Sequence, residues 1–323
     1  MGSKNISYTA ASTLPVKLII DKGLTQSIKS HNIYPTHIQI NPSNRCNFNC
    51  SFCSLSNRDK EIELDWDRMK ETVYKFYKLG TKAATITGGG DPLMYTKINE
   101  LIDLLDRFGI KVGLVTNGTL FKRFNLDNIN KVTWCRISIS DEYKPKLDFL
   151  EEVVQNKTDW SFSYVVTKQF NKNKLFETIN FANKHNFTHV RIVNDILSGC
   201  EDGLMETIKQ LLKDNNIDDS KVIYQGRKTF SRGAKRCLIG LMKPNISPDG
   251  MITSCCGIQY AINPPPLDFN KKFAIGYVED IEHIWKNQKY FEGTFCSKCY
   301  YSDYNNILNI LWDSNEIQHQ EFI

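Results

Sequence analysis

A regular alternation of strand-like and helix-like segments between residues 36 and 194 restricts the fold of this chain most. Alternating apolar and polar residues at 36–40 predict a first strand, and Asp65 is a predicted N-cap for a helix that ends at Gly80. The same criteria predict later strands near 82–87, 111–116, 132–139, 160–167 and 188–194, and later helices near 97–108, 146–156 and 173–185.

This rhythm amounts to six β/α units in about 160 residues. Strands and helices of these lengths imply a parallel sheet with right-handed crossovers. The predicted fold class is therefore α/β, as a partial (β/α)6 TIM-like barrel. Reactive groups in such folds lie at the carboxyl ends of the strands, which is where the loop after the first strand is expected.

The pattern predicts three segments along the chain. Residues 1–35 are an irregular or partly helical lead-in, residues 36–235 the barrel, and residues 236–323 a small C-terminal domain anchored by cysteines. Within the last segment we expect a hairpin over 246–252 that turns at Pro248-Asp249-Gly250, a loop at the proline run 264–266 and a short helix near 280–287.

Composition excludes several classes of protein. With 41% hydrophobic and 24% charged residues the balance is that of a soluble globular protein, and no apolar run reaches the roughly 20 residues of a membrane span. No signal-peptide pattern opens the chain, so we expect a cytoplasmic protein without a membrane partner. The net charge of +5 comes mostly from scattered lysines, and no nucleic-acid-binding motif accompanies it.

The ten cysteines are clustered rather than spread. Structural disulfides are not expected in a reducing cytoplasm, where clustered cysteines usually indicate metal. One set lies within eight residues and contains Cys46, Cys50 and Cys53. A second group lies in the last third and contains Cys237, Cys255, Cys256, Cys296 and Cys299, while Cys135 and Cys200 stand apart.

The first set has the spacing C-x3-C-x2-C. Three thiolates on a short loop can bind three irons of a 4Fe–4S cubane, which leaves the fourth iron open to a substrate or cosubstrate. A purely electron-carrying cluster normally has four cysteine ligands. A zinc knuckle is the alternative, but it needs a fourth nearby ligand, and the nearest histidine is His37 on the upstream strand.

The segment from Asn44 to Cys53 resembles the signature loop of the radical S-adenosylmethionine (SAM) superfamily. This resemblance implies that the amino and carboxylate groups of SAM bind the open iron. It further implies that reduction of the cluster cleaves SAM to a 5′-deoxyadenosyl radical. Phe52, directly before the third cysteine, is then expected to pack near the adenine.

A glycine run, Gly88-Gly89-Gly90-Asp91, follows the second predicted strand. Consecutive glycines let a backbone approach a ligand closely, and the Gly-Lys-Ser/Thr ending of a phosphate-binding loop is absent. The run is similar to the Gly-Gly-Glu-Pro segment of radical SAM proteins. That similarity implies that these four residues hold the methionine amino group of SAM, with Asp91 in place of the commoner Glu. A tight β/α turn is the alternative.

Further candidates for SAM binding lie at later strand ends. By the same resemblance, Asn117 lines the site, and Ser138 and Ser140 reach the ribose or carboxylate of SAM. Arg191 and Asn194 on the last predicted strand are candidates for the SAM carboxylate or the substrate. Turn chemistry or filling of the sheet interior explains each of these residues equally well.

The second cysteine group resembles the "twitch" domain, a shortened SPASM extension of radical SAM barrels. The resemblance implies one auxiliary 4Fe–4S cluster with all four positions filled, because too few cysteines remain for two. Its implied ligands are Cys237, Cys255, Cys296 and Cys299. Cys256 is either a cluster ligand in place of Cys255 or a free thiol. For the whole set, the alternative is a structural zinc site with four thiolates.

The resemblance implies an enzyme whose radical abstracts hydrogen from a carbon of a peptide, an aminoglycoside or sugar, or a nucleotide. An auxiliary cluster that accepts an electron gives oxidation or cross-linking, whereas a cysteine that donates hydrogen gives epimerisation. Cys200 and Cys256 are the catalytic candidates for that donor, followed by Cys135; a small buried apolar role is the alternative for each. The implied electron donor is a flavodoxin or ferredoxin.

Two other classes of protein remain as alternatives. A non-catalytic two-cluster electron-transfer protein does not consume SAM, and the glycine run and missing fourth ligand argue against it. A zinc-stabilised nucleic-acid-binding module contains no iron, and the scattered charge and regular β/α pattern argue against that class.

Overall fold

The computed structural model of the chain describes residues 14–143, 145, 147–168, 170–195, 197, 203–225, 231–260 and 269–314. Contacts divide these residues into two compact units. The described parts of Pro42–Glu63 and Thr85–Thr229 form the first unit. Those of Asn5–Asn41, Leu64–Ala84 and Phe230–Ile323 form the second. No helix among the described residues is long and apolar enough to cross a membrane.

A parallel sheet forms the centre of the first unit. Its neighbouring strands follow chain order: β3 (Lys111–Thr116), β4 (Val132–Ser140), β5 (Asp159–Val166), β6 (His189–Asn194) and β7 (Val222–Gln225). The α/β class with a mostly parallel sheet is thus confirmed, and β3 to β6 lie where the sequence predicts them. The prediction that β6 is the last strand is wrong, because β7 adds a further parallel neighbour.

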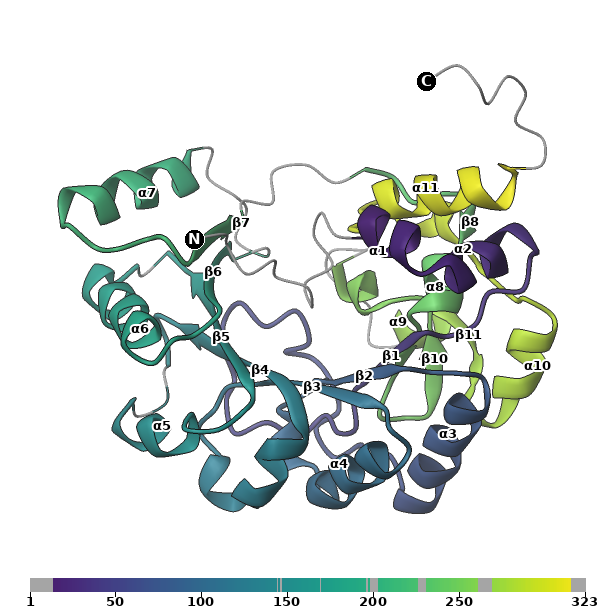
Figure 1. Cartoon of the computed structure of the whole chain (residues 1–323), viewed down its shortest axis with the longest axis horizontal. Coiled ribbons are helices and arrows are strands. Elements are labelled where there is room, and N and C mark those ends of the chain that lie inside the picture. Colours follow the sequence, from purple (N-terminus) through teal and green to yellow (C-terminus); the bar gives the residue numbers. More distant parts are fainter. Residues whose placement is uncertain are drawn as a thin grey trace. The chain divides into compact units, whose positions relative to one another are not determined.

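Helices of the first unit cover one face of this sheet. Figure 1 shows α5 and α6 along the outer side of β4, β5 and β6. On that side Phe162 of β5 packs against Phe187 with ring centroids 4.5 Å apart and against Phe181 of α6 at 6.0 Å. The helical segments of this unit are η1 (Pro92–Met94), α4 (Ile98–Arg107), η2 (Phe121–Arg123), η3 (Leu126–Lys131), α5 (Leu147–Val153), α6 (Lys172–Lys184) and α7 (Leu204–Asp214).

The opposite face of the same sheet is polar. Successive side chains of a strand point to opposite faces, so residues that alternate with the apolar core positions share this second face. The register forms two rows across β4, β5 and β6. In one row Ser161 pairs with Arg136 on one side and His189 on the other, and in the second row Ser163 pairs with Ser138 and Arg191 in the same way.

Helices at both ends of the chain meet in the second unit. The N-terminal helices α1 (Leu14–Ile20) and α2 (Lys22–Lys29) pack against α11 (Ser302–Trp312), as Figure 1 shows. The predicted helix over 65–80 is confirmed as α3 (Trp66–Lys78). Asp65 caps α3 by accepting from the backbone N–H groups of Asp67 and Arg68, and Gly80 ends the turn with a φ of +90°.

The strands of the second unit join distant parts of the sequence. β1 (His37–Ile40) pairs in parallel with β9 (Asn245–Ile246), which pairs antiparallel with β10 (Met251–Thr253). The predicted hairpin is therefore confirmed, and Gly250 takes the positive φ of its turn, +85°. β10 also pairs antiparallel with β11 (Ala274–Tyr277). In a separate small sheet, β8 (Arg236–Cys237) pairs antiparallel with β12 (Phe291–Glu292).

Short helices complete the second unit: α8 (Ile239–Met242), η4 (Cys256–Tyr260), α9 (Phe269–Phe273), η5 (Val278–Asp280), α10 (Ile281–Lys286) and η6 (Gly293–Phe295). α10 lies where the sequence predicts a short helix. β2 (Ala83–Ile86) spans the border between the units. The proline run at 264–266 lies outside the described residues. The partial (β/α)6 barrel, the C-terminal domain and the boundaries 1–35, 36–235 and 236–323 stay predictions.

Candidate functional site

The loop that carries Cys46, Cys50 and Cys53 belongs to the first unit and is closed by Arg58. The Arg58 guanidinium donates from Nε to the carbonyl of Asn44 at 2.8 Å and from Nη1 to that of Leu55 at 2.7 Å. Its Nη1 also lies 3.6 Å from the Cys53 sulfur. Arg58 thus ties the two ends of the loop together and places a positive charge beside one thiol.

The three thiols of the loop lie close enough to influence one another electrostatically. Burial, followed by the neighbouring Cys53, Glu142 and Cys46, raises the pKa of Cys50 to about 12. Burial also raises the pKa of Cys46, against a hydrogen bond from the backbone N–H of Phe48. Thiolates at these positions need a compensating positive charge, and bound iron supplies one.

This donor set fits the three cysteine-bound irons of a 4Fe–4S cluster. Among the residues that the structure describes, no three His, Cys, Asp or Glu side chains converge on one point that could hold a single metal ion. A cubane does not require such convergence, because each iron takes its own thiolate. Phe52, the predicted adenine neighbour, is half-buried within the loop.

The glycine run touches the backbone directly before Cys46. Gly90 donates its N–H to the carbonyl of Ser43 at 3.0 Å, and Asp91 donates its own to the carbonyl of Arg45 at 2.8 Å. A Cβ on Gly90 would lie 1.9 Å from the Arg45 carbonyl oxygen, and one on Gly89 would lie 1.8 Å from Asn44 Oδ1. Gly90 must therefore lack a side chain for the two loops to meet, whereas at Gly89 the Asn44 side chain would have to move.

Gly88 has the same requirement within the run itself, because a Cβ there would lie 1.6 Å from the carbonyl oxygen of Gly90. Asp91 is buried, and its carboxylate accepts from the Thr116 hydroxyl at 2.9 Å, Asn117 N–H at 2.7 Å and Leu93 N–H at 2.9 Å. Burial raises the pKa of Asp91 even though these bonds oppose the rise. The carboxylate thus fastens the glycine run to the end of β3.

Asn117 connects the end of β3 with the cysteine loop. Its Nδ2 donates to Asn47 Oδ1 at 2.9 Å, and its Oδ1 accepts from the Thr119 hydroxyl at 2.6 Å. Asn47 closes the triangle by donating to Thr119 Oγ1 at 2.9 Å. The structure therefore brings the predicted residue Asn117 to the same place as Cys46 and its neighbours.

The end of β4 also contacts the cysteine loop, through two residues that the sequence analysis missed. Glu142 accepts hydrogen bonds from the backbone N–H of Ser51, at 3.0 Å, and from the Ser51 hydroxyl. Tyr143 stacks on Phe48 with centroids 4.5 Å apart. The sequence did contain a signal for both residues, because an acidic and an aromatic residue follow closely after a predicted strand.

The predicted serines support these two residues. The Ser140 hydroxyl accepts from the Glu142 N–H at 3.2 Å, and the Ser138 hydroxyl is hydrogen-bonded to that of Tyr143. Arg191 lies on the polar face of the sheet, where its Nη2 donates to Ser163 Oγ at 3.0 Å.

Positive charge gathers on this polar face. Burial, followed by the nearby guanidinium groups of Arg136 and Arg191, lowers the pKa of His189 to about 3. Arg136 is buried and stacks over the ring of Trp134 at 5.3 Å. Arg136 and His189 were not singled out from the sequence, because charged groups inside a strand pattern give no separate signal.

In the second unit the predicted auxiliary ligands influence one another electrostatically: Cys299 acts on Cys237 and Cys296, and these two act on Cys255. Burial raises the pKa of Cys237 and of Cys296 to about 12 each, and Cys299 acts on both. The pKa of Cys255 is raised well above its usual value, mainly by burial and then by Cys256, Cys237 and Cys296. Four thiols in one part of this unit are a suitable donor set for a four-ligand cluster, in which each iron takes its own thiolate. Zinc needs its thiolates around one point, and the described residues show no such convergence.

Helix α11 borders this cysteine set. Asn305 is buried, with its Oδ1 accepting from the Ile239 N–H at 3.0 Å and its Nδ2 lying 3.6 Å from the Cys237 sulfur. Among the candidate hydrogen donors, the Cys256 sulfur lies 3.5 Å from the Tyr301 hydroxyl. Cys135 is fully buried in β4, and Cys200 lies outside the described residues.

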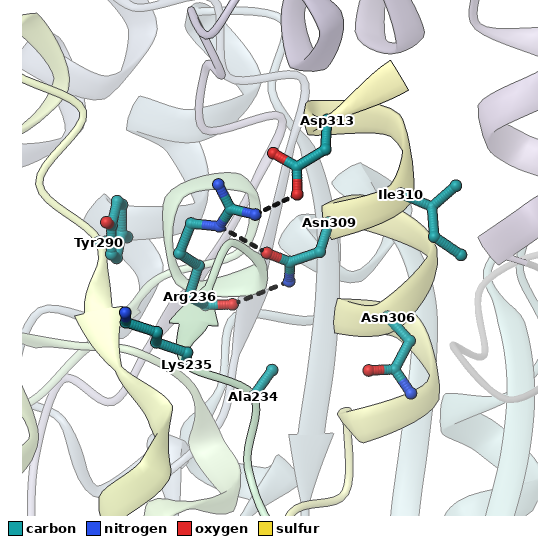
Figure 2. A pocket seen from close by; sticks show the side chains of 8 residues that line it. All are labelled: Ala234, Lys235, Arg236, Tyr290, Asn306, Asn309, Ile310 and Asp313. Carbon is teal, nitrogen blue, oxygen red and sulfur yellow. Dashed lines mark hydrogen bonds and ion pairs between the residues drawn. The ribbon is translucent and has the colours of Figure 1, made fainter. Parts of the chain in front are cut away.

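A groove of about 910 Å³ opens between β8 and α11 (Figure 2), and Arg236, the neighbour of Cys237 in sequence, lines it. Arg236 donates from Nε to Asn309 Oδ1 at 2.8 Å and forms an ion pair with Asp313. Asn309 Nδ2 returns a bond of 3.0 Å to the Arg236 carbonyl. These contacts, drawn in Figure 2, hold the strand that carries Cys237 against α11.

Comparisons with known proteins show which described family part of this chain is similar to. Residues 40–188 match the sequence model of the "Radical SAM superfamily". The chain is 23% identical to a GTP 3′,8-cyclase of Helicobacter pylori, over 76% of this chain and 87% of that protein. It is 25% identical to the radical SAM cyclopropyl synthase TigE of Paramaledivibacter caminithermalis, over 68% of this chain and 57% of that protein.

Solved structures share the fold. The structure of Streptococcus suis SuiB bound to the precursor peptide SuiA aligns with a TM-score of 0.59 and 16% identity, covering 96% of this chain and 81% of SuiB. The structure of anSMEcpe with bound AdoMet and a Kp18Cys peptide aligns with a TM-score of 0.54 and 14% identity, over 82% of this chain and 86% of that one.

Proposed function

We propose that this chain, whose residues 40–188 match the sequence model of the radical SAM superfamily, is a member of that superfamily and an enzyme that abstracts hydrogen from a substrate carbon. Cys46, Cys50 and Cys53 would hold the 4Fe–4S cluster. When bound, the cluster and SAM supply a 5′-deoxyadenosyl radical. The observation that carries the proposal is the three-thiol loop, which is fixed from separate directions by Arg58, Asn117 and Glu142.

The other predicted site residues shape the surroundings of this loop. The glycine run brings bare backbone against the segment before Cys46, and backbone hydrogen bonds join the two segments. Asp91 supports the run from within the protein through its bonds to Thr116 and Asn117. We assign Gly88 to Gly90, Phe52, Asn117, Ser138 and Ser140 to SAM binding on this basis.

A second 4Fe–4S cluster on Cys237, Cys255, Cys296 and Cys299 is the next part of the proposal. Its support is the mutual influence of these thiols on their pKa values and the amide of Asn305 beside Cys237. A cluster there can accept an electron from the substrate, which favours oxidation or cross-linking. Epimerisation with Cys256 as hydrogen donor is the alternative, in which Tyr301 is the neighbour of the thiol.

A peptide is the substrate class that we propose first. The alignment with SuiB, solved with a precursor peptide, extends over nearly the whole of this chain. A nucleotide is the second candidate, for two reasons. Several sequence relatives are GTP 3′,8-cyclases, and the sheet of the first unit carries Arg136 and Arg191 on one polar face, where an anionic group could be bound.

The test is SAM cleavage by anaerobically purified protein. We expect the wild type, reduced with dithionite, to convert SAM to 5′-deoxyadenosine, detected by mass spectrometry. A Cys46/Cys50/Cys53→Ala variant should form none above background. A reduced, iron-loaded wild type that leaves SAM intact would contradict the proposal and favour a two-cluster electron carrier. Peptide and nucleotide libraries that raise the yield of 5′-deoxyadenosine then separate the two substrate classes.

A further inference from the structure

Glu142 presents a carboxylate to the middle of the cysteine loop. It accepts both hydrogen bonds that Ser51 can donate, one from the backbone N–H at 3.0 Å and one from the hydroxyl. Ser51 lies between Cys50 and Cys53, so these two bonds fix the short segment that carries two of the three thiols. A carboxylate that accepts two hydrogen bonds from one residue restricts position as well as orientation.

The backbone around Glu142 is itself anchored to the sheet. Its N–H donates to Ser140 Oγ at 3.2 Å, and Ser140 N–H donates to the Tyr143 carbonyl at 3.1 Å. The Tyr143 ring stacks on Phe48 with planes only 18° apart, at the start of the same loop. The carboxylate therefore extends from a fixed strand end and not from a freely moving surface segment.

Glu142 also acts on the loop through its charge. Its carboxylate is hydrogen-bonded to the backbone N–H of Ser51, the residue directly after Cys50, so its negative charge lies beside the segment that carries two of the proposed cluster ligands. A negative charge that disfavours a thiolate also disfavours an added electron on a cluster held by that thiolate. Net charge near an iron–sulfur cluster is one of the factors that set its reduction potential.

We propose that Glu142 is a positioning residue that holds the Cys50–Cys53 segment through Ser51 and lowers the reduction potential of the cluster on this loop. The inference rests on the proposed function, since it requires the cluster. A lower potential makes the reduced cluster a stronger electron donor. The carboxylate would thus combine two roles, retention of the cluster and adjustment of its reducing power.

Two substitutions separate the roles. Glu142→Gln removes the charge but keeps both contacts, because the amide oxygen can accept from Ser51 N–H and the amide nitrogen can donate to the hydroxyl oxygen. Glu142→Ala removes the charge and the contacts. Ser51→Ala removes one contact and leaves the charge. Glu206→Gln on α7 is the matched control, because Glu206 is also exposed and does not act on Cys50.

The measurements use anaerobic, iron-loaded protein. The midpoint potential is followed by EPR for the cluster whose signal changes on addition of SAM, and iron loss from it is timed with a chelator. We expect a more positive potential in Glu142→Gln and Glu142→Ala. We expect iron loss several-fold faster than wild type in Glu142→Ala, intermediate in Ser51→Ala, and unchanged in Glu142→Gln and Glu206→Gln.

Wild-type potential in both Glu142 variants would overturn the electrostatic role. Wild-type rates of iron loss in Glu142→Ala and Ser51→Ala would overturn the positioning role. A wild type that carries no SAM-responsive cluster would instead refute the proposed function. If only the Glu142 inference is wrong, the wild type carries a SAM-responsive cluster and the Glu142 and Ser51 variants behave like it. The two failures are therefore distinguishable.

Discussion

At the scale of single residues, the close approach of the glycine run to the cysteine loop leads to a first prediction. Gly90→Ala should destabilise the first unit by about 2 kcal/mol and reduce iron retention, because its Cβ would overlap the Arg45 carbonyl. Urea unfolding and iron content check this. Gly109→Ala is the control, since Gly109 has a φ of +67° but no described atom close to the position of an added Cβ. This substitution should lower the free energy of unfolding by about 1 kcal/mol and leave iron retention unchanged. Normal iron retention in Gly90→Ala would contradict the account.

A second prediction concerns the buried His189. Its folded pKa of about 3 lies below the ordinary value of 6.5, so the unfolded chain takes up the proton first as pH falls. The stability contributed by neutral His189 is present above pH 6.5 and lost below it, by about 1.4 kcal/mol per pH unit.

Urea-unfolding free energies at pH 7.5 and 5.5 test this dependence, with His189→Gln as the comparison. The wild type should lose about 1.4 kcal/mol more than the variant over this interval. The pKa of the buried His37 in the second unit is also lowered, so His37 makes stability depend on pH in the same direction. His37 is present in both proteins, so the difference between their losses reports His189 alone. Equal losses would show that His189 does not titrate as described.

The residues of the candidate site were only partly predictable from the sequence. Cysteine spacing and consecutive glycines are visible as patterns, and the structure brings Asn117 to the same loop. Arg58 and Glu142 were not predicted, because their contacts depend on how loops fold back on one another. An arginine or glutamate on an exposed loop has the same appearance in a sequence whether or not it has such a role.

At the scale of elements, local signals determined how well each one could be predicted. α3 has a capping residue, helical spacing and a terminal glycine, and all three appear in the structure. β7 has only four half-buried residues and follows a polar stretch, so no alternation marked it. β8 and β12 have two residues each and exist only through their mutual pairing.

Helix α11 provides an element-scale prediction through Asn305. Asn305→Ala should cost about 2 kcal/mol, because it leaves the buried Ile239 N–H without this acceptor. It should also make the reduction potential of the proposed auxiliary cluster more negative, since a hydrogen-bond donor beside the Cys237 sulfur is lost. Urea unfolding and an EPR redox titration measure the two effects.

Asn306→Ala on the same helix is the control, because Asn306 is exposed in the groove of Figure 2. It should leave both the unfolding free energy and the potential near wild type. If Asn305→Ala matches this control in potential, the amide does not act on an auxiliary cluster.

At the scale of the whole molecule, the assignment of segments to units was not predictable from chain order. Residues 14–41 and 64–84 group with the C-terminal segment, in part because β1 pairs with β9 more than 200 positions away in sequence. Such pairing leaves no local pattern to read. The consequence for function is that the two cysteine sets belong to different units, so each unit is expected to hold its own cluster.

The iron content and reduced EPR spectrum of anaerobically purified wild type and Cys46/Cys50/Cys53→Ala protein test this central claim most directly. The account predicts about eight irons in the wild type and about four in the variant, with a 4Fe–4S signal remaining from the second set. Zinc without iron in the variant would show that the second set is structural. A wild type that binds no iron after reconstitution would contradict the radical SAM account itself.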